Sequence, residues 1–108
     1  MTISINVGEE FYPRPAGRFY EDGSHSGQRF REEFLLPSIN RLAEGEKLHI
    51  DFSTVTMAGS SFLEESFGGL IRKRNISKDK LLSILEITSK RQIIIKRIYE
   101  YINDAKPE

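Results

Sequence analysis

Two adjacent serines, Ser60 and Ser61, follow an apolar run and stand directly before a segment with helical spacing. Open α/β sheets place their functional sites at the carboxyl ends of strands, where the first N–H groups of a helix favour an anion. A helix needs only one N-cap residue, and Ser61 with Glu64 has the spacing of a capping box. The hydroxyl of Ser60 is then free. Ser60 is therefore a candidate phosphoacceptor, and the alternative is an ordinary turn serine.

A glycine pair, Gly68 and Gly69, interrupts the helix predicted after the serines, although a helical glycine costs roughly 0.5–1 kcal/mol relative to alanine. Two interpretations remain open. The glycines either let neighbouring elements of the same domain pack closely, or they form a flat docking surface for a second protein. The second interpretation predicts a partner-binding face made of Gly59, Ser60, Ser61, Phe62, Glu64, Glu65, Gly68, Gly69 and Arg72.

A second candidate site precedes the first predicted helix, where Ser24, Ser26, Gly27 and Arg29 form a Gly/Ser-rich start with a nearby positive charge. Such a start can hold a phosphate, although the Lys-Ser/Thr ending of a P-loop is absent. The alternative function is therefore a small nucleotide or anion receptor that uses the helix starts at residues 24–29 and 60–64. The arginine can equally pair with a neighbouring glutamate.

The sequence contains no pattern typical of catalysis or of metal binding. His49 and Asp51 share one side of a predicted strand, but the strand rise separates them by about 7 Å, too far for the hydrogen bond of a Ser-His-Asp triad. There is no G-x-S-x-G motif and no metal-ligand spacing. We expect no catalytic residue, cofactor or metal, and we expect Asp51 to accept hydrogen bonds from N–H groups near the strand end.

Composition indicates one domain that spans residues 1–108, since 38% of the residues are hydrophobic and can form one small core. Sixteen basic and sixteen acidic residues give zero net charge, which argues against a nucleic-acid-binding protein. No apolar run approaches the roughly 18 residues of a membrane span, and the first residues lack signal-peptide character. Without cysteine, the chain fits the reducing cytoplasm. The oligomeric state does not follow from the sequence.

Hydrophobic periodicity predicts a small α/β domain with a mixed, mostly parallel sheet of about four strands and helices packed against it. We expect strands at residues 2–7, 48–52 and 81–87, and a weaker one at 18–20. Ser26 is the predicted N-cap of a helix that ends at Gly45, with a kink or break near Leu36 because of Pro37. Further helices are predicted from Ser61 and over residues 89–104, the last with Ser89 and Gln92 as a capping box.

The stretches "GRFYEDGSHSGQRFREEFLLPSI" and "IDFSTVTMAGSSFLEESFGGL" resemble the STAS-like domain family of unknown function. They are more distantly similar to the STAS domains of anti-sigma-factor antagonists. In those antagonists a partner kinase phosphorylates the first hydroxyl residue of an Asp-Ser-Ser/Thr-Gly motif, a position that matches Ser60; Gly59 and Phe62 replace the Asp and the Gly. The resemblance implies a prokaryotic, non-enzymatic regulatory or adaptor domain. It also implies a partner such as a histidine-kinase-like ATPase or kinase, bound through residues 59–72.

Overall fold

The computed structural model describes residues 2–108 and contains one three-stranded parallel sheet with the order β1-β2-β3. The strands are β1 (Thr2–Asn6), β2 (Lys47–Asp51) and β3 (Leu85–Thr88). Ile5 lies beside Ile50, which lies beside Ile87, so the three strands are in register along their apolar positions. The predicted α/β architecture is confirmed, with three parallel strands in place of about four.

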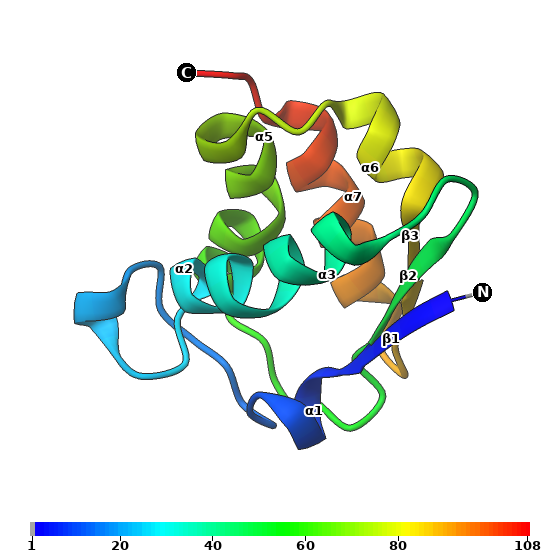
Figure 1. Cartoon of the computed structure of the whole chain (residues 1–108). Coiled ribbons are helices and arrows are strands. Elements are labelled where there is room, and N and C mark those ends of the chain that lie inside the picture. Colours follow the sequence, from blue (N-terminus) through cyan, green and yellow to red (C-terminus); the bar gives the residue numbers. More distant parts are fainter. Residues whose placement is uncertain (1) are drawn as a thin grey trace.

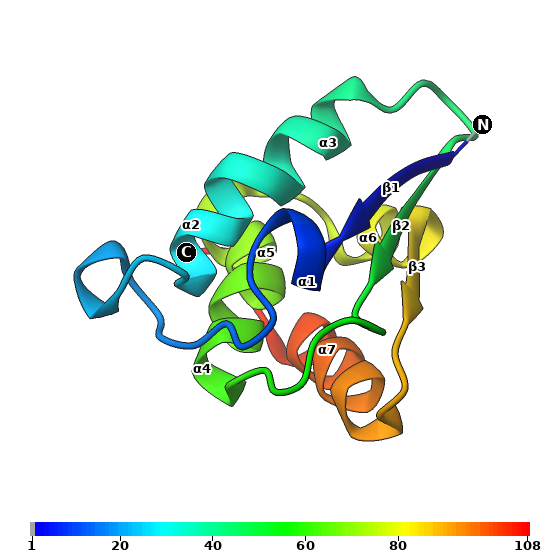
Figure 2. The same cartoon turned by 90° about the horizontal axis from the view of Figure 1, so that it is seen from below.

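The helices gather on one face of the sheet (Figure 1). Because side chains alternate along a strand, Ile5, Leu48 and Ile50 point into the helical layer and are buried, whereas Ser4 and Lys47 are exposed on the opposite face. The segments that follow the strands lie together at the carboxyl end of the sheet (Figure 2). They are α1 (Val7–Glu10), the loop at residues 52–59 and the start of α7 (Gln92–Asp104).

Two long helical segments, residues 27–41 and 60–74, form most of the helical layer, and each is interrupted by one π-helical stretch. The first consists of α2 (Gly27–Phe30), η2 (Arg31–Leu35) and α3 (Leu36–Arg41). The second consists of α4 (Ser60–Leu63), η3 (Glu64–Gly68) and α5 (Gly69–Arg74). α2 and α7 both pack on η3. Within residues 2–108, no helix has the length and apolarity needed to cross a membrane.

The first long helix begins as predicted and continues past Leu36, where a kink or a break was expected. Ser26 is buried, and its hydroxyl accepts a hydrogen bond from the Arg29 N–H at 3.2 Å, which confirms Ser26 as the N-cap. The helix is not broken near Leu36. The π-helical stretch ends at Leu35, so Pro37 falls in the first turn of α3, where the changed hydrogen-bond pattern accommodates its missing N–H.

The end of that helix was predicted at Gly45, but α3 ends at Arg41. The next residue, Leu42, is extended, with ψ of 131°. The Glu46 carboxylate then accepts the Ala43 N–H at 2.7 Å and closes a separate turn. Gly45 lies within this turn with φ of +84°, so its role is to allow the turn and not to end the helix.

The weak strand predicted at residues 18–20 is wrong. The chain instead forms the short 3₁₀-helix η1 (Tyr20–Asp22). The Asp22 carboxylate accepts the N–H groups of Arg18 at 3.2 Å and Phe19 at 2.9 Å. These local hydrogen bonds use the backbone donors that a sheet would need.

The strand predicted at residues 81–87 is correct only in its second half. Residues before Leu85 belong to α6 (Lys78–Ile84), whose N-cap Ser77 accepts the Lys80 N–H at 3.1 Å. Within α6 Leu81 is buried, and β3 begins only at Leu85, which is also buried. The apolar run was ambiguous because short runs fit a strand or a buried helix equally well.

Both predicted capping boxes are wrong. Gly59 is the N-cap of α4, so Ser61 lies inside the first turn and no side chain caps this helix. Arg91 is the N-cap of α7, and the Ser89 hydroxyl accepts the Arg91 N–H at 3.1 Å, one residue before the Gln92 N–H that a capping box would use. In both cases the capping-box pattern indicated the correct region of the chain but the wrong N-cap residue.

Replacement of the two serines should therefore have different effects. Ser26→Ala should lower the free energy of unfolding by about 0.5–2 kcal/mol, because it removes a buried N-cap. Ser61→Ala should change it by less than about 0.5 kcal/mol, because Ser61 is exposed and caps nothing. Urea unfolding of the two variants measures both values. An equal loss in both variants would contradict the assignment of Gly59 as the N-cap.

Candidate functional site

The loop at residues 52–59 leads from the carboxyl end of β2 to the serine pair and is fixed by hydrogen bonds on both sides. The Asp51 carboxylate accepts the Ser53 N–H at 2.8 Å, which confirms the predicted role of Asp51. Hydrogen bonding to Ser53 holds the pKa of Asp51 below its usual value, and the neighbouring His49 and Lys90 add to this effect. The loop that leads to the serine pair thus begins beside an ionised carboxylate at the end of the central strand.

A second segment braces the same loop from the other side. The Thr56 N–H donates to the carbonyl of Pro13 at 2.8 Å, and the Gly59 N–H donates to the carbonyl of Pro15 at 3.1 Å. The proline-rich stretch at residues 13–15 therefore runs alongside the loop. Because proline has a fixed φ angle, this brace is stiff and positions the start of α4.

Ser60 and Ser61 are both exposed at this helix start. The first helical hydrogen bond runs from the Leu63 N–H to the Gly59 carbonyl at 3.0 Å. Among residues 2–108, the N–H groups of Ser60, Ser61 and Phe62 have no acceptor. Met57, three residues earlier, is 53% exposed. The site therefore presents two hydroxyls, open backbone donors and one apolar side chain to solvent.

Four residues of the predicted partner-binding face lie inside the molecule and not on its surface. Phe62 is buried in an aromatic cluster, with ring centroids 5.5 Å from Phe30 and 6.0 Å from Phe11. Glu65 is also buried, and so are both glycines. The residues that remain exposed or half-buried are Gly59, Ser60, Ser61, Glu64 and Arg72. The predicted face is thus too wide in its extent, because α4 and η3 turn one side toward the core, and its remaining residues stay a prediction.

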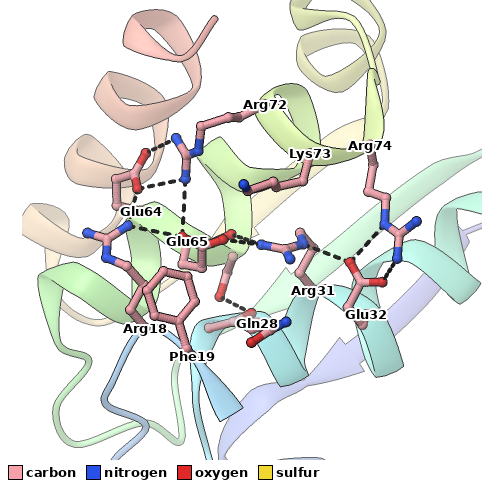
Figure 3. A network of polar contacts seen from close by, with 12 residues as sticks. Arg18, Phe19, Gln28, Arg31, Glu32, Glu64, Glu65, Arg72, Lys73 and Arg74 are labelled. Carbon is pink, nitrogen blue, oxygen red and sulfur yellow. Dashed lines mark hydrogen bonds and ion pairs between the residues drawn. The ribbon is translucent and has the colours of Figure 1, made fainter. Parts of the chain in front are cut away.

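The two glutamates that follow the serines belong to a network of ion pairs (Figure 3). Glu64 contacts Arg18 and accepts two hydrogen bonds from Arg72, the shorter at 2.8 Å. Glu65 contacts the same two arginines at 3.1 and 3.2 Å. Burial alone would raise the pKa of Glu64, but the hydrogen bonds from Arg72 and Arg18 outweigh burial and lower it. Glu64 is therefore ionised, and both carboxylates are paired with arginines.

The centre of the network is the ion pair between Arg31 and Glu65, which joins η2 to η3. Their side chains are only 5% and 2% exposed. Arg31 also donates to the Glu65 carbonyl at 3.0 Å and to the Glu32 carboxylate at 2.8 Å. Arg74 pairs with Glu32 from the other side (Figure 3). The network thus runs from Arg18 at the surface, through the buried pair, to the end of α5.

The glycine pair makes room for this network. A Cβ atom at Gly69 would collide with the Arg31 guanidinium and lie 3.1 Å from its Cδ. A Cβ atom at Gly68 would collide with the Glu64 carboxylate and lie 3.6 Å from the Tyr101 carbonyl oxygen. Close packing within the domain is therefore the correct interpretation of the glycines, and the interpretation as a flat docking surface is wrong.

The predicted anion site before the first helix does not have free donors. The N–H groups of Gly27 and Gln28 donate to the carbonyls of Gly17 and Arg18, each at 2.9 Å, and the Arg29 N–H donates to Ser26. The Arg29 side chain donates to the Ser24 carbonyl and pairs with Glu33. A phosphate would have to replace these bonds. Of the two helix starts in the receptor hypothesis, only the one at Ser60 is open.

The histidine considered for catalysis has local partners. His49 lies 2.6 Å from the Thr88 hydroxyl and 3.4 Å from the Ser4 hydroxyl on the exposed face of the sheet. Asp51, which a triad would place on the imidazole, instead accepts the Ser53 N–H. In the part of the chain that the structure describes, no group of three or more His, Asp or Glu residues is arranged to hold a metal ion.

Sequence reasoning assigned Arg72 to the predicted face but missed that Arg18, Arg31 and Arg72 pair with Glu64 and Glu65, although one signal was present. Arg31 lies four residues before Leu35 and seven before Ser38, both of which are buried. A charged residue within the apolar stripe of a helix indicates a buried ion pair, because an unpaired buried charge is too costly. Arg18 offered no such signal, since it lies in an irregular segment.

A comparison with protein families agrees with the fold. A family model described as a STAS-like domain of unknown function matches residues 26–92, so the chain belongs to that family. The match extends from the N-cap Ser26 to the first residue of α7 and includes both long helices and the serine pair. No curated protein and no solved structure matches the chain.

Helix propensity alone predicts that alanine in place of a helical glycine stabilises the protein. The packing role assigned to the glycines predicts the opposite. Gly69→Ala should lower the free energy of unfolding by about 1–3 kcal/mol, because it displaces a buried guanidinium from its carboxylate. Gly68→Ala is the matched control and should cost less, because the Glu64 carboxylate that it meets is half-buried and can move. Urea unfolding of both variants gives the values. A Gly69→Ala variant at least as stable as the wild type would contradict this role.

Proposed function

We propose that this STAS-like domain is a non-catalytic regulatory or adaptor module that binds a partner protein through the start of its second long helix. The binding face consists of Met57, Gly59, Ser60 and Ser61, with the paired side chains of Glu64 and Arg72 at its rim. The observation that carries the proposal is the exposed Ser60 hydroxyl on a helix start without a side-chain cap.

The arrangement of this face supports binding to a protein surface. Met57 supplies an exposed apolar side chain, and the serine hydroxyls and free N–H groups supply hydrogen-bonding groups. Protein interfaces combine apolar and hydrogen-bonding groups in this way. The proline brace and the ion-pair network hold the face in one conformation before binding, which lowers the entropic cost of association.

Ser60 is the proposed switch of this interaction. A kinase would transfer the γ-phosphoryl group of ATP to the Ser60 oxygen, with ADP as the other product and the hydroxyl proton released to solvent. The phosphate adds about 1.5–2 negative charges beside the open end of a helix dipole, so the fold should tolerate it. The nearby Glu64 and Glu65 are already paired with arginines, which limits their repulsion of the phosphate. A partner, however, would have to desolvate a doubly charged group, so binding should weaken.

The partner that the family resemblance favours is a histidine-kinase-like ATPase or kinase, which would both bind the domain and phosphorylate it. This choice extends the proposal beyond the chemistry of the face, which specifies only a protein surface that accepts an apolar side chain and hydrogen-bonds to serine. The domain is expected to act in the cytoplasm, where ATP is present.

The proposal is tested by searching the neighbouring genes for a histidine-kinase-like ATPase or kinase and using the protein that such a gene encodes as the partner. Titration calorimetry should show that Met57→Asp and Ser60→Asp lower the affinity at least about tenfold, because each places a charge on the face. Ser60→Ala should bind like the wild type. Mass spectrometry after incubation with ATP should find phosphate on Ser60 and none in the Ser60→Ala variant.

Leu82→Asp is the matched control, because Leu82 is a similarly exposed apolar residue, 42% accessible, on α6 at the other end of β3. It should bind like the wild type. Unchanged melting curves would show that all variants are folded. Wild-type affinity in Met57→Asp, or phosphate only at other residues, would contradict the proposed face or the proposed switch, respectively.

A further inference from the structure

The start of α7 carries four cations that have no partner in residues 2–108. Lys90, Arg91, Lys96 and Arg97 are all exposed, and none of their side chains forms an ion pair or a hydrogen bond among these residues. Four other arginines, in contrast, are held in the network around Glu65. These cations lie within eight consecutive residues, 90–97, a stretch that we call the basic start of α7.

These cations lie at the unfavourable end of their helix. The N-terminus of a helix carries a partial positive charge, so anions stabilise it and cations do not. Arg91 is itself the N-cap and forms no side-chain cap, although Ser, Thr, Asp and Asn are the residues that stabilise this position. No acidic residue lies in the first turn. Residue types that lower stability at their position, without a compensating contact, are typical of a functional surface.

The basic start of α7 is short and includes one exposed apolar residue. Residues 90–97 span about 12 Å along the helix axis. Ile93 lies between the cations in the sequence and is 46% exposed. Beyond this stretch the same helix exposes Glu100 and Asp104, which limit the basic surface to the first two turns. Asp51 lies close enough to Lys90 to feel its charge, whereas no such influence on Asp51 is found for Arg91.

We propose that the basic start of α7 binds an acidic segment of a partner protein, with the cations on its carboxylates and Ile93 against an apolar side chain. A nucleic acid fits less well, because the chain has zero net charge and a polyanion would extend over Glu100 and Asp104. A membrane fits less well because one isoleucine buries too little apolar surface for stable attachment. This inference does not depend on phosphorylation of Ser60.

Arg91→Asp tests the proposal by separating stability from binding. Aspartate at the N-cap should raise the melting temperature by about 4 °C or more, because it caps the helix and suits the dipole. The same change should lower the affinity for an acidic peptide, in which glutamates flank a central leucine, at least about tenfold. Fluorescence anisotropy measures this affinity at low salt, and wild-type binding should weaken as salt is added.

Arg41→Asp is the matched control, because it changes the charge identically at an exposed, unpaired arginine near the C-terminus of α3. It should keep the peptide affinity and should not raise the melting temperature. Three results would overturn the proposal: wild-type protein that does not bind the peptide, tighter binding to duplex DNA or to anionic vesicles than to the peptide, or unchanged peptide affinity in Arg91→Asp. A lower melting temperature in Arg91→Asp would assign Arg91 a structural role and would overturn it as well.

Discussion

Arg31 and Glu65 form a buried ion pair between the two long helices, and the surrounding sequence is constrained by it. Two charges removed from water are costly unless their geometry is good and their remaining hydrogen bonds are satisfied. Here the guanidinium also reaches the Glu65 carbonyl and the Glu32 carboxylate, while the Glu65 carboxylate also reaches Arg18 and Arg72. Gly69 leaves the space that the guanidinium occupies. The pair therefore requires a glycine in one helix and further charged partners at the surface.

The same constraint positions the candidate site. Because η3 is held against α2 and η2, the start of α4 faces outward at a fixed place beside the loop at residues 52–59. The proline-rich stretch braces that loop through the N–H groups of Thr56 and Gly59. Ser60 thus lies on a rigid element. A change in the charge of Ser60 would leave the shape of the surrounding face unchanged.

The sequence predicted the parts of the fold that depend on periodicity and on local hydrogen bonds. β1, β2 and the buried stripe of α7 follow from their apolar spacing, and Ser26 was recognised as an N-cap because its local pattern is decisive. Prediction from the sequence failed where tertiary contacts override the local sequence pattern. Ser61 and Glu64 have capping-box spacing, yet Arg18 and Arg72 take the glutamate away from the backbone. Arg18 is 46 residues distant along the chain, so no local rule reveals this contact.

For the candidate site, the sequence indicated the region of the helix start and the unusual glycines. It could not show which groups the serines and the glycines face. Gly68 and Gly69 signal close approach, and only the structure shows that Glu64 and Arg31 are the groups that approach. A double-mutant cycle of Arg31→Met and Glu65→Leu tests the central ion pair directly. Each single change should cost about 3–5 kcal/mol of unfolding free energy, and the double change should cost at least about 2 kcal/mol less than their sum. Additive costs, within about 0.5 kcal/mol, would contradict the claim that this pair holds the two helices together.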